Sequence, residues 1–136
     1  MAILERHETG AVTRLVMNAP ERLNALSDEM LAELHSALDD IADDQSVRAV
    51  VLSGRGKAFC AGHDLKQMTA GRAQDDGGTA YFTDLFDRCA AVMMRVQSLP
   101  QPVIAQVHGI ATAAGGQLVA TCDMAVAASG TRCGVN

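Results

Sequence analysis

The chain has 136 residues and a formal net charge of −5, and 49% of its residues are hydrophobic while 20% are charged. This size and composition are typical of one soluble globular domain and exclude fibrous and largely disordered proteins. Nucleic acid is excluded as a main partner, because binding to a phosphate backbone depends on clustered Lys and Arg side chains, and the sequence has no such cluster.

Apolar stretches in the chain are too short to cross a membrane. The uninterrupted run at residues 103–105 is far below the ~20 residues that a membrane helix needs. At the N-terminus, Glu5 interrupts the apolar residues before the hydrophobic segment of a signal peptide can develop. We therefore expect a cytoplasmic protein with no membrane association.

Four cysteines are spread along the chain, at positions 60, 89, 122 and 133. They have neither the paired C-x-x-C spacing of a zinc site nor the density of a disulfide-rich domain. Reduced thiols and no metal site are expected. For Cys60, which lies in a Gly-rich segment, the sequence favours a small buried packing residue over a functional thiol.

The first half of the chain predicts a hairpin, a helix and a buried strand. Residues 3–8 and 12–17 are rich in strand-forming side chains and are separated by a Thr-Gly pair suited to a turn. A helix is expected after Ser27, its N-cap, because apolar residues recur at helical spacing over 30–41. Residues 47–52 lack alternation, as is typical of a central parallel strand covered on both faces.

The second half alternates helices and strands. Residues 69–79 are polar and Gly-rich and predict a loop, which is either a plain surface connection or a functional lid. A helix is expected over 79–99, ended by the prolines that follow, and then a strand over 102–107. Small residues lead into a helix over 117–122 and a short strand over 124–127. This alternation predicts one α/β domain with a mainly parallel sheet.

Two Gly-rich turns, at residues 59–65 and 109–117, each join a strand to a helix. At such a joint the first amide N–H groups of the helix have no intrahelical partner and lie at the positive end of the helix dipole. Neither turn matches a nucleotide-binding Gly-rich motif. If both turns face one cleft, an N–H group from each can hold the oxygen of a polarised carbonyl as an oxyanion hole, although Gly-rich turns are also common structural joints.

Three segments carry a family resemblance: R-L-N-A-L at 22–26, G-K-A-F-C-A-G-H-D-L-K at 56–66, and P-V-I-A at 102–105 leading into 109–123. In this order and spacing they resemble successive signatures of the crotonase superfamily, the enoyl-CoA hydratase/isomerase family. The resemblance covers nearly the whole chain. The A-G-H-D-L loop and the A-T-A-A-G turn are most similar to the enoyl-CoA hydratase domain-containing subgroup.

This resemblance implies a crotonase-like spiral of β-β-α turns, of which residues 1–136 form the N-terminal part of a crotonase/ClpP-like domain without its helical C-terminal region. It implies an enzyme that binds an acyl-CoA thioester and stabilises an enolate, as in hydration or isomerisation of enoyl-CoA. Because CoA belongs to the substrate, no separate cofactor is expected. The full-length protein is expected to be a homo-oligomer, a trimer or a hexamer.

The resemblance also implies which residues form the site. The backbone N–H groups of His63 and Ala114 correspond to the oxyanion hole, and Gln117 stands where family hydratases have their first catalytic glutamate. The residues implied to bind the CoA thioester are Arg22, Leu23, Ala25, Ala61, Gly62, His63, Asp64, Leu65, Ile110, Ala113, Ala114 and Gly115.

Gln117 departs from the family pattern. An amide cannot act as a general base, although it can orient a water or a substrate oxygen through hydrogen bonds. The second glutamate of the family would fall just after Asn136. Three alternatives therefore stay open: an enolate-forming enzyme, a non-catalytic relative that binds CoA thioesters, or an inactive truncated fragment.

Other polar residues near the turns have structural as well as catalytic interpretations. For Asp64 the sequence favours an N-cap of the following helix over a general base. Asp123 is expected to be a structural hydrogen-bond acceptor. The ring of His63 titrates near neutrality and suits acid–base chemistry, but the resemblance implies only its amide.

The last strand of the chain is expected to leave the sheet with an open edge. A sheet that ends at Val126 or Val135 exposes unpaired backbone groups and apolar faces, which are aggregation sites. We therefore expect the 136-residue chain alone to be marginally stable or insoluble, and inactive.

Overall fold

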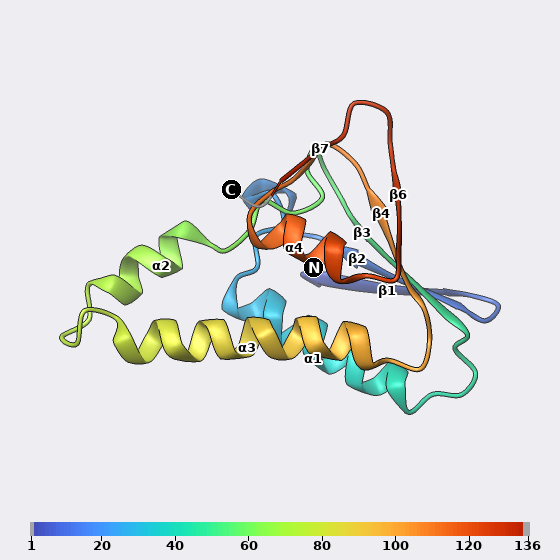
Figure 1. Ribbon diagram of the computed structural model, residues 1–136, viewed down its shortest axis with the longest axis horizontal. Helices are drawn as coiled ribbons and strands as arrows, with labels where there is room; N and C mark the ends of the chain where they lie inside the picture. Colours follow the sequence, from blue (N-terminus) through green and yellow to red (C-terminus); the bar gives the residue numbers. More distant parts are fainter. Residues whose placement is uncertain (1, 135–136) are drawn as a thin grey trace.

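The computed structural model describes residues 2–134 and places five strands in one sheet, in the order β1-β2-β3-β4-β6 (Figure 1). β1 (Leu4–Thr9) and β2 (Val12–Met17) form the predicted antiparallel hairpin. Parallel pairing continues from β2 through three strands, β3 (Ala49–Gly54), β4 (Val103–Val107) and β6 (Met124–Ala127). The α/β class with a mainly parallel sheet, predicted from the sequence, is confirmed.

Two long helices lie side by side next to this sheet (Figure 1). α1 (Asp28–Ala42) begins after Ser27, whose side chain accepts a hydrogen bond from the N–H of Met30, as predicted. α3 (Thr79–Ser98) ends just before the two prolines that the sequence indicated as its stop. No helix in the described part of the chain is long and apolar enough to cross a membrane.

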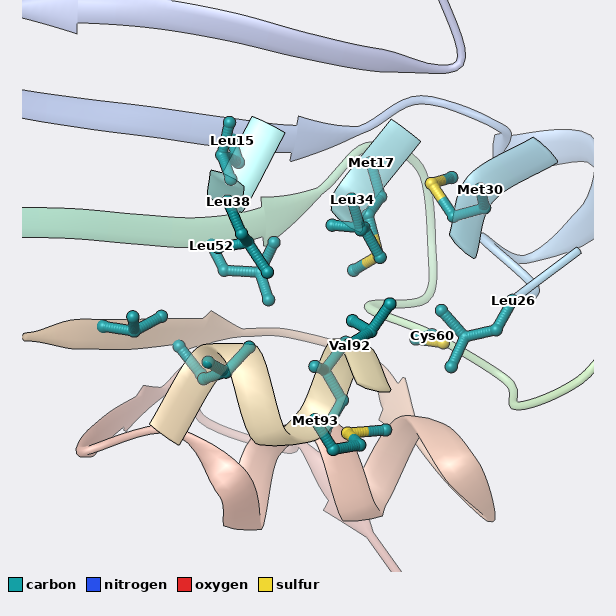
Figure 2. Packing of buried hydrophobic residues seen from close by; sticks show 14 of the residues in the cluster. Leu15, Met17, Leu26, Met30, Leu34, Leu38, Leu52, Cys60, Val92 and Met93 are labelled. Carbon is teal, nitrogen blue, oxygen red and sulfur yellow. The ribbon is translucent and has the colours of Figure 1, made fainter. Parts of the chain in front are cut away.

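The core is aliphatic and holds the helices on the sheet. Leu15 of β2, Leu38 of α1 and Leu52 of β3 lie close together, and α3 contributes Val92 and Met93 (Figure 2). Each of these side chains is at most 6% exposed. Complete burial of an aliphatic side chain stabilises a fold by about 1.5–3 kcal/mol, so this apolar stripe is what fixes the two helices.

Short elements complete the structure around the end of the sheet. A single 3₁₀ turn, Pro20–Arg22, follows β2, and α4 (Ala114–Thr121) precedes β6. β5 (Ile110–Ala111) and β7 (Arg132–Cys133) pair in parallel as a second, two-stranded sheet. The sequence did not predict β5 and β7, because two residues are too few to show a periodic pattern.

The predicted loop over 69–79 is wrong at its start. α2 (Leu65–Arg72) is helical there, and only residues 73–78 connect it to α3. The helix has a good N-cap in Asp64, but its sequence lacks the apolar stripe that would have identified it. Its polar composition therefore resembled a loop.

The start of α4 is also three residues earlier than predicted, at Ala114 instead of Gln117. Gly115 is a poor helix former, which is why the helix was expected to begin later. In the structure a Cβ at Gly115 would lie 2.1 Å from the carbonyl oxygen of Cys60. Close packing against the neighbouring turn therefore requires glycine in the first turn of this helix.

β6 is an open edge of the sheet as far as residues 2–134 describe it. All four of its residues are exposed, including Met124 at 62% and Val126 at 61%. The uncovered apolar edge predicted at Val126 is therefore found, whereas Val135 lies outside the described residues.

Candidate functional site

The segment after β3 and the segment after β4 run side by side. The N–H of Phe59 donates to the carbonyl of Ile110 at 2.9 Å, and the N–H of Thr112 donates to the carbonyl of Cys60 at 3.1 Å. Phe59 and Cys60 are fully buried, so these bonds lie inside the fold. The two Gly-rich turns singled out in the sequence therefore meet in one place.

Close contact between the turns depends on Gly62. Its φ of +99° lies in the region that favours glycine. A Cβ at this position would lie 3.1 Å from the Cβ of Ala113 and 3.5 Å from the backbone nitrogen of Ala114. The turn that carries His63 thus passes directly beside the first residue of α4.

Ala113 determines the direction of the next amide. Its φ of 52° and ψ of −127° are strained for a residue with a Cβ, at a cost of about 1–3 kcal/mol. The strained peptide turns the chain from β5 into α4, and the first N–H of that helix, on Ala114, has no intrahelical partner. Strain of this kind persists where the surrounding structure enforces it, and it is frequent at functional sites.

Within residues 2–134, no hydrogen-bond acceptor is found for the N–H of His63 or of Ala114. His63 forms a bridge with Leu26, but the bond in that bridge runs from the N–H of Leu26 to the carbonyl of Gly62, at 2.6 Å. The His63 amide is thus left unused. Two unpaired N–H donors on adjoining turns, one of them at a helix start, form an arrangement that can hold one oxyanion.

A groove of about 320 Å³ opens beside the first turn. Glu21 and Lys66 line it, although the sequence did not assign them to the site. The groove also brings together seven of the predicted binding residues: Arg22, Leu23, Ala25, Ala61, His63, Asp64 and Leu65. The remaining ones belong to the packed first turn or to the adjoining second turn and do not line the groove: Gly62, Ile110, Ala113, Ala114 and Gly115.

Asp64 is a helix cap, as the sequence favoured. Its carboxylate accepts hydrogen bonds from the N–H groups of Lys66 at 2.9 Å and Gln67 at 3.1 Å. It also lies 3.5 Å from the guanidinium of Arg22. The Arg22 side chain remains 53% exposed at the rim of the groove, where it is open to an anionic group of a ligand.

The ring of His63 is half-buried in the groove wall. It meets the ring of Phe86 edge-on, with centroids 5.8 Å apart. Its Nδ1 is buried without a hydrogen-bond partner among the described residues. Burial lowers the pKa of His63 below its ordinary value, partly opposed by the backbone of Leu26, so the neutral imidazole is favoured.

Gln117 lies on α4, one helical turn after Ala114. Its side chain is exposed, while its backbone N–H donates to the carbonyl of Ala113 at 3.1 Å. An exposed amide here can orient a water or a substrate oxygen, but it cannot remove a proton from carbon.

Two other candidates are structural. Cys60 is fully buried, and burial raises the pKa of its thiol to about 11, which supports the packing role expected from the sequence. Asp123 accepts a hydrogen bond from the N–H of Val103 at 2.7 Å and so ties β4 to the end of α4, as predicted.

Sequence reasoning missed two side chains that shape the site. Asn24 is completely buried, and its side chain forms hydrogen bonds with the backbone of Ala19, Arg55 and Ala58. Gln67 reaches from α2 to the start of α1. For Asn24 the signal was its place inside the R-L-N-A-L motif, whereas for Gln67 a single sequence carries no signal.

Known proteins share this architecture. A curated relative, "Enoyl-CoA hydratase domain-containing protein 3, mitochondrial" of Xenopus laevis, is 43% identical over 121 residues, covering 89% of the chain and 40% of the relative. "1,2-epoxyphenylacetyl-CoA isomerase" of Escherichia coli is 38% identical and covers 93% of the chain and 47% of the relative. The crystal structure of an enoyl-CoA hydratase from Mycobacterium smegmatis is 52% identical, has a TM-score of 0.90, and covers 96% of the chain and 49% of that structure.

These relatives are longer than the chain and correct one prediction. The chain spans about 40% of the Xenopus laevis protein and about half of the Mycobacterium smegmatis structure. The expectation of a cytoplasmic protein is wrong, because the Xenopus laevis protein and the rat and human proteins of the same name are called mitochondrial. The reasoning failed because a test for secretory signal peptides does not separate cytoplasm from mitochondrion.

The family match extends beyond the two turns. The sequence pattern of the family described as enoyl-CoA hydratase/isomerase matches residues 7–136, from β1 through the site and past β7. Together with the shared fold and the resemblance to the domain-containing subgroup, this match identifies the chain. It belongs to the enoyl-CoA hydratase/isomerase family, the crotonase superfamily.

Proposed function

We propose that the chain belongs to an enzyme that binds an acyl-CoA thioester along the groove and polarises its carbonyl between the N–H groups of His63 and Ala114. The observation that carries the proposal is the contact between the two turns, in which a Cβ at Gly62 would lie 3.5 Å from the Ala114 nitrogen. The reaction class is hydration or isomerisation of enoyl-CoA through an enolate. The names of the relatives, a hydratase and a CoA-thioester isomerase, support this class.

The two amides would act on the thioester oxygen. When a proton leaves the α-carbon, the electron pair moves toward the carbonyl, and negative charge collects on its oxygen. Fixed N–H donors stabilise that charge, and removing one such donor typically costs about 2.7–4 kcal/mol in the transition state. The N-terminal end of α4, at Ala114, adds its positive dipole to the same point.

The remainder of the ligand would lie along the first turn. Arg22 and Lys66 place positive charge at the groove, which suits the phosphate groups of CoA. Leu23, Ala25 and Leu65 add apolar surface beside them. No separate cofactor is needed in this scheme, because CoA enters with the substrate.

Gln117 favours a second candidate function, a relative that binds CoA thioesters without turning them over. The exposed amide can orient a water but supplies no base. Turnover of short- or medium-chain enoyl-CoA would eliminate this candidate, whereas binding without turnover would support it. An inactive fragment is the third possibility, and it predicts neither binding nor turnover.

A pair of matched ligands tests the proposed binding mode. Hexanoyl-CoA carries the thioester carbonyl, and the thioether hexyl-CoA lacks it but has the same chain and CoA portion. We expect both to stabilise the folded chain by about 2.7 kcal/mol at 100 times the dissociation constant. This stabilisation should raise the temperature midpoint of unfolding. Only hexanoyl-CoA should shift the amide proton resonances of His63 and Ala114 downfield in NMR spectra.

Equal shifts of these two resonances with both ligands would refute the oxyanion hole and leave the groove as a CoA site. No midpoint shift with either ligand would refute binding by this chain. The homo-oligomeric state of the full-length protein stays a separate prediction.

A further inference from the structure

α2 joins directly to the site but has little apolar packing of its own. Its N-cap, Asp64, directly follows His63 in the chain, so the start of the helix adjoins the His63 turn. Of the residues of α2, Gly71 is the one that is buried, Met68 is partly buried against the core, and Leu65 is 75% exposed. Since Met68 is the one apolar side chain of the first turn that packs on the core, polar contacts also contribute to holding the start of this helix in place.

The side chain of Gln67 connects the first turn of α2 to the first turn of α1. Its Oε1 accepts a hydrogen bond from the backbone N–H of Asp28 at 2.9 Å, and its Nε2 donates to the carboxylate of Glu29 at 3.3 Å. Its own backbone N–H donates to the Asp64 carboxylate at 3.1 Å. A primary amide can accept from an N–H through its oxygen and donate to a carboxylate through its nitrogen at the same time.

Charged groups surround this contact on every side. α1 contributes the carboxylates of Asp28 and Glu29, and the Asp28 carboxylate lies 2.8 Å from the guanidinium of Arg88 on α3. The hydroxyl of Tyr81, also on α3, donates to the same carboxylate at 3.5 Å. On the groove side, Arg22 pairs with Asp64, and Lys66 is the neighbour of Gln67 in the chain.

Glu29 is ionised at neutral pH. Its own backbone N–H, the Ser27 side chain and Gln67 hold the pKa of this carboxyl below its ordinary range. A negative group placed at position 67 would therefore face an ionised Glu29, with Asp28 and Asp64 close by.

We infer that Gln67 is a positioning residue, which holds the start of α2 against α1 and so keeps the His63 turn aligned with Ala114. This inference rests on the proposed function for its effect on ligand binding, but the contact itself can be tested without ligand. Gln67 acts through the His63 turn and does not touch the reacting atoms.

Two variants separate hydrogen bonding from mere space filling. Gln67→Glu keeps the size and the acceptor for Asp28 but replaces the donor to Glu29 with a like charge. The double variant Glu29→Gln/Gln67→Glu exchanges the two groups, so that a carboxylate at 67 can accept from both the Asp28 N–H and the new amide. Gln74→Glu is the control for added charge, because Gln74 is exposed in the connection after α2.

Amide hydrogen exchange of the ligand-free chain at pH 7 provides the first measurement. The amides of Lys66, Gln67 and Met68 all donate to Asp64, so they report the integrity of the first turn of α2. We expect these amides to exchange about tenfold faster in Gln67→Glu, from the loss of a hydrogen bond to a charged group. The control Gln74→Glu and the double variant should exchange like the native chain.

The exchange defect of Gln67→Glu should also depend on pH. Two neighbouring carboxyls cannot both ionise freely, so protonation of one of them relieves the repulsion as the pH falls from 7 to about 5. A role in simple packing would give the same defect at both pH values. If Gln67→Glu does not fold, Gln67→Met removes both hydrogen bonds without adding charge, and its exchange at pH 7 carries the same comparison.

Hexanoyl-CoA affinity is the second measurement. We expect Gln67→Glu to weaken binding by about tenfold at pH 7 and the double variant to restore it. Unchanged exchange in both Gln67→Glu and Gln67→Met, or a double variant as defective as Gln67→Glu, would overturn the inference. Altered exchange in a chain that does not bind hexanoyl-CoA at all would uphold the contact and refute the proposed function instead.

Discussion

Asn24 braces the loops beneath the groove from a fully buried position. Its Oδ1 accepts from the N–H of Ala19 at 2.8 Å, and its Nδ2 donates to the carbonyls of Arg55 and Ala58, both at 2.9 Å. Its φ of 53° lies in the left-handed region, which asparagine tolerates better than most residues. The Asn24 side chain therefore forms hydrogen bonds with three backbone groups, and the residue also tolerates the left-handed backbone conformation at this position.

We expect Asn24→Ala to lower the free energy of unfolding by about 3 kcal/mol, because it leaves buried backbone groups without partners. Chemical denaturation measures the loss. Asn18→Ala is the control, since within residues 2–134 the Asn18 side chain makes a single, exposed hydrogen bond, to the carbonyl of Ala2, and its loss should cost less than about 1 kcal/mol. Equal losses in the two variants would contradict the bracing role.

The stability of the fold depends on pH through the ring of His63. Its ordinary pKa of 6.5 applies in the unfolded chain, and burial lowers the pKa in the fold. As the pH falls below 6.5, the unfolded chain takes up a proton more readily than the folded chain, so protonation favours unfolding. The stability due to neutral His63 is thus present above pH 6.5 and is lost as the pH falls through the folded pKa.

We expect the native chain to lose more stability than His63→Asn as the pH is lowered from 7 to 5. The measurement is the free energy of unfolding of both proteins at each pH, and the informative quantity is their difference. This difference should shrink steadily below pH 6.5. A difference that stays constant over the range would show that the ring titrates alike in the folded and unfolded chains.

Among the elements, α4 combines a strained entry with a close contact. Ala113 adopts φ 52° and ψ −127° immediately before the helix. Glycine would adopt this conformation without steric cost, although it has more freedom to lose on folding. The alanine therefore stores strain at the point where the chain enters α4 at Ala114.

We expect Ala113→Gly to raise the free energy of unfolding by about 1 kcal/mol. The relief of backbone strain should outweigh the extra conformational freedom that glycine loses on folding. Ala120→Gly, at an exposed position of the same helix, should instead lower it by up to about 1 kcal/mol. Thermal unfolding of both variants tests the opposite signs. Loss of stability in both would mean that the conformation of Ala113 is not strained.

The long elements were predictable because each carries a local signal. The hairpin, α1 with its Ser27 cap, β3, α3 and β4 all follow from periodicity, caps and prolines. α2 and the first turn of α4 were missed because tertiary contacts decide them. In α4, the carbonyl of Cys60 occupies the space that a Cβ of Gly115 would need, and no local pattern reveals such a contact.

The same division holds for the site. The sequence indicated both turns, because in each of them a strand is followed by small residues and then by a helix. The cap at Asp64 followed from its residue type. That the turns touch through Gly62 and Ala113 depends on β3 and β4 being neighbours in the sheet, which sequence order alone does not establish. Gln67 was missed for a similar reason, because its partners lie 39 and 38 residues away in the chain.

At the scale of the whole molecule, the two edges of the main sheet differ in protection. β1 carries Glu5, Arg6, His7 and Glu8, and charged side chains on an edge strand discourage pairing with another chain. β6 has the sequence M-A-V-A, carries no charge and is exposed at every residue. As far as residues 2–134 describe the sheet, β6 is therefore the unprotected edge.

We expect the 136-residue chain to self-associate through β6 as its concentration rises, and Val126→Lys to suppress this association. Since Val126 is 61% exposed, the substitution should leave the free energy of unfolding nearly unchanged. Ala128→Lys adds the same charge just past the strand and should have a smaller effect. Light scattering after size-exclusion chromatography over a concentration series distinguishes them, and equal suppression by both variants would assign the effect to net charge and not to the edge.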